Sequence, residues 1–325
     1  MTLCKAGETR RKSETALALE GGAEGFALAV GILVFHIDAP CVAEILGAVE
    51  AALLHAAADA LGAAVILVVH MITSLKVLRF QYSTIVPQYA AKGGESLSLY
   101  AIGDLHLALG NAEKDMAVFG GRWVGYTDKI RAAFSELSEE DVIVLCGDSS
   151  WGMSLEEALP DFQLLNELPG KKILVKGNHD YWWETASKMN AFFEKHTLDK
   201  LSILHNNCLY YEDVALCGTR GWFFEEERGG AHDEKIMKRE IGRLEMSLKA
   251  AGEREKLVFL RYPPVFQNYR CEGILQLLAD YDVSECCSGH IHGKGCYAAF
   301  RGTLEKTHHR LVSADYLDFI PAKIR

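Results

Sequence analysis

The stretch SLSLYAIGDLH, residues 96–106, joins a short apolar run to a carboxylate and an imidazole. The run ends in glycine, and Asp104 and His106 follow it at once. Two later stretches repeat this arrangement, because DVIVLCG at 141–147 and KKILVKG at 171–177 are also short apolar runs closed by glycine. Short apolar runs bounded by turn residues are typical of buried strands.

Helical stretches alternate with these strands to the end of the chain. The helices are expected at 127–138, 157–168, 232–251 and 270–281, and the later strands at 212–218, 256–262 and 282–289. This alternation predicts an α/β fold with a substantial sheet core. In such sheets the functional side chains lie on loops just beyond the carboxyl ends of the strands.

Four of the expected strand ends are followed by side chains that can bind a metal ion. Carboxylate, amide oxygen and imidazole together suit Mn²⁺, Fe or Zn²⁺ better than they suit a thiolate site or an all-oxygen site. In an extended chain, side chains two residues apart point the same way, so we expect both members of the DxH and HxH pairs to reach one metal. A single loop of this kind is usually an ordinary turn, whereas four in this order favour a metal centre. The loops are Asp104-Leu105-His106, Gly147-Asp148, Gly177-Asn178-His179-Asp180 and Gly289-His290-Ile291-His292.

These loops, with the phrases around them, resemble the calcineurin-like metallophosphoesterase superfamily. The wider phrases resemble most closely an uncharacterised bacterial branch of it. The resemblance covers residues 97–325 and leaves out everything before residue 96. The phrases that carry it are YAIGDLHL, GDSSWGMSLEEAL, VKGNHDYWW, GTRGW and RYPP.

The resemblance implies a site for two divalent metal ions inside a β-sandwich flanked by helices. Matched by motif, the first metal would be bound by Asp104, His106 and His292. Asp148 would bridge both metals. The second metal would be bound by Asn178 and His290, and His179 would stand beside the leaving group, held by Asp180.

This arrangement predicts hydrolysis of a phosphate ester. Two metals clamp the phosphoryl oxygens and lower the pKa of a bridging water, so that hydroxide attacks phosphorus in line. His179 would then protonate the departing oxygen as general acid. The substrate itself, whether a monoester, a diester, a nucleotide or a phosphoprotein, depends on loops outside the motifs.

One residue departs from the family pattern. The family usually carries a further histidine in a His-Tyr-Pro-Pro phrase, and here that place is taken by Arg261. A guanidinium has no lone pair to donate and stays cationic, so it cannot replace a metal ligand. We therefore expect the second metal to bind weakly. The alternative is a non-catalytic scaffold, against which the intact His179 and Asp180 argue.

Charge and cysteine content limit the surroundings in which the protein works. The chain has 34 Lys and Arg residues against 44 Asp and Glu residues, a net charge of -10, so nucleic-acid binding is not expected. A phosphorylated substrate remains compatible with this charge, because a metal site supplies its own positive charge. The nine cysteines are odd in number and include no CxxC pair, which indicates buried free thiols and a cytoplasmic location.

The composition changes near residue 95, which predicts two parts. Residues 1–95 form an extension rich in Ala, Leu and Val, and residues 96–325 form the metallophosphoesterase domain. The extension can be parsed as a βαβ-like unit or as a stretch that is not a functional domain. Its longest apolar run, 60–75, is shorter than the ~20 residues of a membrane span, so we do not expect one. An enzyme tethered to a membrane by that run is the remaining alternative, and the sequence does not specify an oligomeric state.

Overall fold

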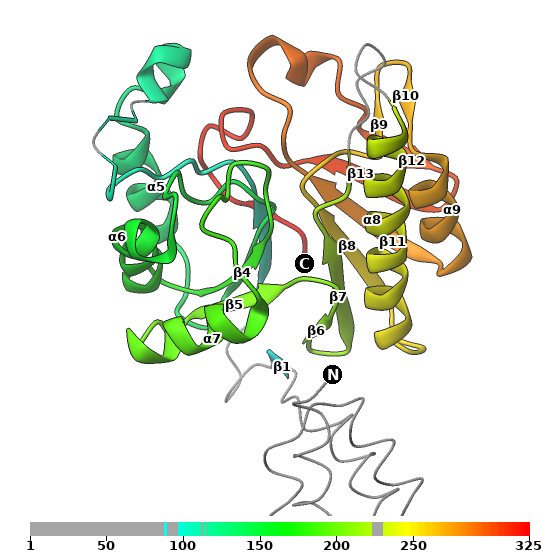
Figure 1. Ribbon diagram of the computed structural model, residues 1–325, viewed down its shortest axis with the longest axis horizontal. Helices are drawn as coiled ribbons and strands as arrows, with labels where there is room; N and C mark the ends of the chain where they lie inside the picture. Colours follow the sequence, from blue (N-terminus) through cyan, green and yellow to red (C-terminus); the bar gives the residue numbers. More distant parts are fainter. Residues whose placement is uncertain (1–87, 90–96, 112, 115, 223–229) are drawn as a thin grey trace, which may run out of the picture. The chain divides into compact units, whose positions relative to one another are not determined.

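The computed structural model describes residues 88–89, 97–111, 113–114, 116–222 and 230–325. Two β-sheets lie face to face in these residues, and helices cover the outer face of each sheet (Figure 1). The expectations for a βαβ-like unit and for the apolar run 60–75 lie outside the described residues. Within the described part of the chain, no helix is both long and apolar enough to cross a membrane.

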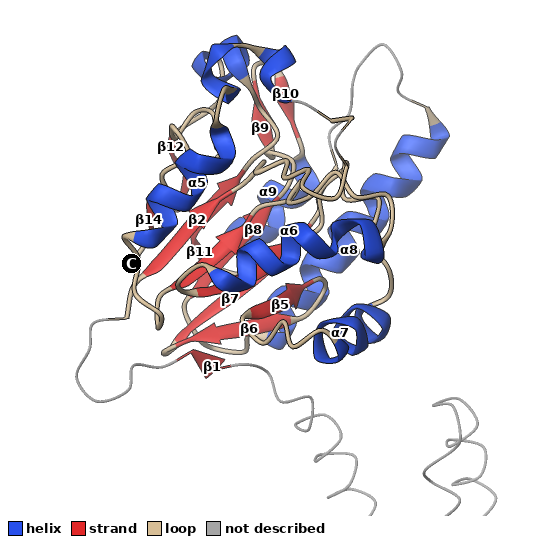
Figure 2. Cartoon of the chain, turned by 90° about the vertical axis from the view of Figure 1, so that its left-hand side faces the viewer, coloured by secondary structure: helices blue, strands red, loops and turns tan. Residues whose placement is uncertain are grey.

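The first sheet has five strands in the order β14-β2-β3-β4-β5. Strands β2 to β5 run parallel to one another, and β14 at one edge runs antiparallel to β2. Helices α5, α6 and α7 lie in front of these strands in Figure 2. The strands are β2 (Leu99–Ile102), β3 (Val142–Leu145), β4 (Lys171–Val175), β5 (Leu201–Leu204) and β14 (Ala322–Lys323), and the helices are α5 (Tyr126–Ser135), α6 (Leu155–Glu167) and α7 (Ala186–Lys195).

The second sheet has seven strands in the order β1-β6-β7-β8-β11-β13-β12. Helices α8 and α9 cover its outer face (Figure 1). Its strand β1 lies inside the stretch assigned above to the N-terminal extension and pairs in parallel with β6. The strands are β1 (Gln88–Tyr89), β6 (Cys208–Tyr211), β7 (Val214–Thr219), β8 (Lys256–Leu260), β11 (Val283–Ser288), β12 (Gly302–Leu304) and β13 (Thr307–Leu311), and the helices are α8 (Ala231–Ala250) and α9 (Glu272–Asp280).

Three short helical turns and a small hairpin complete the described elements. The 3₁₀ helices are η2 (Met116–Phe119), η3 (Gly121–Trp123) and η4 (Gly293–Tyr297), and the hairpin strands are β9 (Val265–Phe266) and β10 (Tyr269–Arg270).

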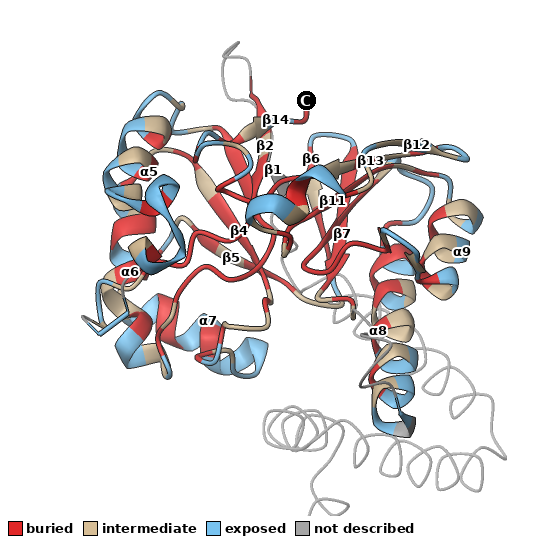
Figure 3. Ribbon diagram, turned by 90° about the horizontal axis from the view of Figure 1, so that it is seen from above, coloured by how far each residue is buried: buried red, intermediate tan, exposed pale blue. Residues whose placement is uncertain are grey.

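The strands are buried on both faces, which explains why they read as unbroken apolar runs rather than as alternating ones. Along β3, Val142 and Val144 pack between the two sheets, whereas Ile143 and Leu145 pack against the helices. Along β8, Phe259 faces the other sheet and Val258 faces the helix side. Figure 3 shows the result, with buried strands at the centre and helices exposed on their outer faces. The predicted β-sandwich flanked by helices is confirmed.

Nearly every element expected from the sequence is present, and the differences are local. Helix α7 and strands β5, β6, β12, β13 and β14 were not anticipated from the sequence. The seven cysteines in the described residues are free and buried, as the sequence indicated. The predicted ligands lie on loops at the carboxyl ends of β2, β3 and β4 in one sheet and of β11 in the other. Arg261 lies at the carboxyl end of β8.

Candidate metal centre

The loops after β2 and β3 are tied to each other by backbone hydrogen bonds. The amide of Asp104 donates to the carbonyl of Gly147 at 2.8 Å, and the amide of His106 donates to the carbonyl of Asp148, also at 2.8 Å. Because β2 and β3 are parallel neighbours, these bonds continue the sheet beyond the strand ends. Three of the predicted ligands are therefore held by main-chain geometry.

The backbone of these loops differs from the extended chain that the sequence analysis assumed. Asp104, His106, Asp148 and His290 have φ values of 62°, 47°, 52° and 75°, in the left-handed region that residues other than glycine rarely adopt. The DxH pair converges because the chain turns tightly at each ligand, and not because side chains alternate along a strand. Strained backbone of this kind is concentrated at functional sites.

Glycine is required where the third loop passes the second. A Cβ atom on Gly177 would lie 1.9 Å from Oδ1 of Asp148 and 2.2 Å from its amide nitrogen. No side chain fits in that space, so the GNHD loop can approach the carboxylate of Asp148 only through glycine.

Asp104, His106 and His292 form a group that can bind a metal. One ligand atom from each lies within 4.8 Å of the others. Nε2 of His292 lies 3.1 Å from Oδ1 of Asp104, and Nε2 of His106 lies 3.9 Å from the same oxygen. The donor set of one carboxylate and two imidazoles suits a divalent transition metal. The structure brings together the three residues predicted for the first metal.

The environment of His106 favours the neutral imidazole, which is the form that binds a metal. It is buried, and burial, with a further contribution from His292, holds the pKa of its imidazole well below the ordinary value. Its Nδ1 is also buried without a hydrogen-bond partner. The nitrogen that faces the carboxylates of Asp104 and Asp148 is Nε2, at 3.9 and 3.7 Å, so Nε2 is the atom that would bind a metal. The first metal therefore fits the residues present.

His292 is oriented by a residue that the sequence analysis missed. Its Nδ1 lies 3.0 Å from Oδ1 of Asp315, whose other oxygen accepts the amide of Gly293 at 2.8 Å. A carboxylate behind an imidazole fixes the ring and raises its basicity as a metal ligand. Asp315 follows strand β13, far along the chain from the histidine, so no local motif announces it.

Asp148 lies beside this group and is completely buried. Its Oδ2 is 3.7 Å from Nε2 of His106, and its Oδ1 accepts the amide of His179 at 2.8 Å. The same Oδ2 forms an ion pair with Arg261. Asp148 is thus placed between the first-metal residues and the arginine.

The residues predicted for the second metal are brought together by Arg261. Nε of Arg261 donates to Oδ1 of Asn178 at 2.9 Å, and Nη2 lies 3.1 Å from Nδ1 of His290. Nη1 forms an ion pair with Asp104. The guanidinium therefore lies among the residues that the resemblance assigned to a second metal, and those residues do not fit that metal.

Asp180 has a different set of partners from the one expected. Its carboxylate accepts six hydrogen bonds, from the amides of Asp148, Gly177, Ser149 and Ser150, from the Ser149 hydroxyl and from the Trp182 indole. The ring of His179 instead has the Tyr181 hydroxyl 3.5 Å from its Nδ1. The expectation that Asp180 holds His179 is corrected accordingly, because the buried carboxylate is fully used by the backbone of two loops.

Aromatic rings surround the histidines of the site. Trp151 stacks on His106 with ring centroids 5.0 Å apart and lies 4.5 Å from the ring of His179. Trp123 stands edge-on to His106 at 5.9 Å. These rings restrict the imidazoles to one position and shield them from water. The GDSSW phrase contains Trp151, but only the folded chain shows its contact with the two histidines.

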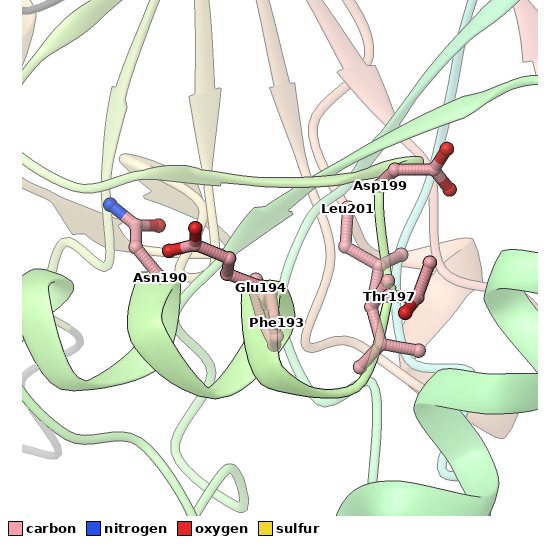
Figure 4. A pocket seen from close by; sticks show the side chains of 7 residues that line it. Asn190, Phe193, Glu194, Thr197, Asp199 and Leu201 are labelled. Carbon is pink, nitrogen blue, oxygen red and sulfur yellow. The ribbon is translucent and has the colours of Figure 1, made fainter.

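A pocket in the described residues lies away from this site. It has a volume of about 330 Å³ and lies beside α7 and β5, where Figure 4 shows Asn190, Glu194 and Asp199 at its edge. Its two carboxylates and the absence of a cationic side chain among its lining residues do not suit a phosphate group. The pocket contains none of the predicted site residues.

The two-sheet sandwich carries its carboxylate–imidazole cluster at the strand ends. The sequence model of the calcineurin-like phosphoesterases matches residues 97–294, more than half of the chain. The chain belongs to this family, which confirms the resemblance seen in the sequence. The family consists of phosphoesterases that bind divalent metal ions.

Solved structures similar to the chain come from several bacteria. A protein of unknown function from Aquifex aeolicus is 17% identical with a TM-score of 0.39, and the match covers 70% of this chain and 96% of that one. The phosphopantetheinyl hydrolase of Mycobacterium tuberculosis is 13% identical with a TM-score of 0.46, covering 71% and 97%. A cold-active protein-tyrosine phosphatase of a Shewanella species is 13% identical with a TM-score of 0.28, covering 73% and 77%. No curated protein sequence matches the chain.

Proposed function

We propose that the chain hydrolyses a phosphate ester at the site formed by Asp104, His106 and His292. The observation that supports this proposal most directly is the convergence of one ligand atom from each of these residues to within 4.8 Å. Asp148, 3.7 Å from His106, is the fourth residue proposed to contact the metal. The donor set suits Mn²⁺, Fe or Zn²⁺, and Mn²⁺ is the first ion to test. When bound, such an ion lowers the pKa of water and polarises a phosphoryl oxygen.

His179 is proposed as the general acid. Its ring is half-buried, beside Trp151 and 5.7 Å from the ring of His106, so it borders the metal residues without belonging to them. Burial and the neighbouring His292 lower the pKa of His179. A phosphate dianion in the site raises that pKa again, because an opposite charge favours the imidazolium. His179 would then carry a proton when substrate is bound and give it to the departing oxygen.

The substrate is proposed to be a phosphorylated molecule in the cytoplasm. The net charge of -10 does not favour a nucleic-acid backbone as partner. The second candidate is a weakly active or non-catalytic protein of the same fold, and the observation that favours it is the buried Arg261 among the metal ligands.

A panel of monoesters and diesters, assayed with Mn²⁺ added to metal-stripped chain, tests the proposal. We expect hydrolysis by the unmodified chain and its loss by at least ~10²-fold in Asp148→Asn, with weaker metal binding, because a charged donor beside the metal is removed. Asp213→Asn, the same change at an exposed turn, is the control and should leave both properties unchanged. Normal turnover and normal metal content in Asp148→Asn would remove Asp148 from the site.

A further inference from the structure

Arg261 is the residue at the site that the family pattern does not explain. It follows strand β8, and its side chain is only 1% exposed although it carries a full charge. A guanidinium stays protonated at neutral pH. A buried cation of this kind is stable only if the groups around it complement its charge and its hydrogen-bond donors.

The surroundings of Arg261 provide that complement from four different loops. Nη1 pairs with the carboxylate of Asp104 and Nη2 pairs with that of Asp148. Nε donates to the side-chain oxygen of Asn178 at 2.9 Å. Two negative charges and an amide oxygen are the partners that a divalent cation would take in the same place.

His290 contributes its lone pair to the same guanidinium. Nη2 of Arg261 lies 3.1 Å from Nδ1 of His290, and since a guanidinium can only donate, Nδ1 must be the acceptor. The imidazole expected to bind a second metal therefore has its Nδ1 lone pair engaged by Arg261.

We infer that the guanidinium of Arg261 takes the place of the second metal ion, so that the centre combines one metal with one fixed organic cation. In the first-metal group, His106 and His292 have no hydrogen bond or ion pair with Arg261 and are left to bind an ion, whereas Asp104 serves both this group and the guanidinium. The buried guanidinium acts as a positioning residue that keeps Asp104 and Asp148 in place by charge and Asn178 by a hydrogen bond.

This inference concerns the same site as the proposed function and is tested by metal stoichiometry rather than by turnover. Metal-stripped full chain is titrated with Mn²⁺, and bound metal is counted by equilibrium dialysis. Electron paramagnetic resonance then distinguishes an isolated Mn²⁺ from a spin-coupled pair. The unmodified chain should bind about one Mn²⁺ with an uncoupled signal, and a second should bind at least ~10²-fold more weakly.

Arg261→His should convert the centre to a two-metal site with a coupled signal, because a lone pair replaces a positive charge. Arg254→His, the same replacement at an exposed position after α8, is the matched control and should still bind about one Mn²⁺. An Arg261→His chain that folds and binds only one Mn²⁺ would overturn the inference.

Two Mn²⁺ of similar affinity in the unmodified chain would also overturn the inference, whether or not the variant folds. The proposed function fails separately. A chain that binds one Mn²⁺ and hydrolyses nothing contradicts the function alone, and a chain that hydrolyses esters with two tight metals contradicts the inference alone.

Discussion

Replacing Asp180 with asparagine tests whether this carboxylate serves the loop backbone or the general acid. The carboxylate accepts bonds on both oxygens, with the amides of Gly177 and Asp148 at 2.6 and 2.9 Å on Oδ2. The other oxygen, Oδ1, accepts from Ser149, Ser150 and Trp182. An asparagine can keep its carbonyl oxygen at the Oδ1 position, but its NH₂ group then faces two amide donors.

The expected loss of stability follows from that mismatch. Each buried donor left without an acceptor costs about 1–3 kcal/mol, so two of them cost ~2–6 kcal/mol. A loss of ~4 kcal/mol, with a urea slope of ~2 kcal/mol per M, lowers the midpoint of unfolding by roughly 2 M. Urea titration followed by tryptophan fluorescence measures this shift directly. Asp199→Asn, the same change at an exposed position, should shift the free energy of unfolding by no more than ~0.5 kcal/mol.

An unchanged urea midpoint in Asp180→Asn would refute this reasoning. If Asp180→Asn unfolds at the same urea concentration as the unmodified chain and loses only turnover, then Asp180 acts on the chemistry and its backbone bonds carry little free energy. If stability falls as expected, the remaining folded enzyme should still depend on leaving-group quality in the same way, because His179 is held by other contacts.

Two further predictions concern the general acid and the N-terminal extension. His179→Ala should keep its metal content while turnover falls by ~10²–10⁴-fold for poor leaving groups and by less for nitrophenolate, and equal losses for both would exclude His179 as the acid. A chain starting at Glu95 should retain full activity because residues 1–95 contribute no site residue. It should melt at a lower temperature than a chain starting at Ile85, which keeps the pairing of β1 with β6, and loss of metal binding in the shorter chain would show that the extension supports the site.

Much of this fold could be predicted because its strands are buried on both faces. Unbroken apolar runs such as 142–145 and 173–175 leave few alternatives to inner parallel strands, and each is closed by a turn that carries polar residues. Short segments with mixed polarity, such as β5 and β6, gave no comparable signal. Their position depends on pairing with strands distant in sequence, which a local pattern does not record.

The sequence predicted which residues form the site, but it did not predict the backbone conformation that brings them together. Asp104, His106 and His292 are brought together as expected, although the reason is left-handed backbone rather than extended chain. Asp315 and Trp151 were missed because their roles exist only once distant loops meet. Arg261 was recognised as a departure from the family, yet only the structure shows that its guanidinium lies among Asp104, Asp148, Asn178 and His290.

The position of Arg261 has a consequence for how the sandwich is held together. Asp104, Asp148 and Asn178 follow strands of the five-stranded sheet, whereas Arg261 follows a strand of the seven-stranded sheet. The ion pairs therefore cross-link the two halves of the protein at the edge where the active loops meet. This one side chain joins loops of both sheets as soon as the chain folds, so the two carboxylates are paired with a cation before any metal ion binds.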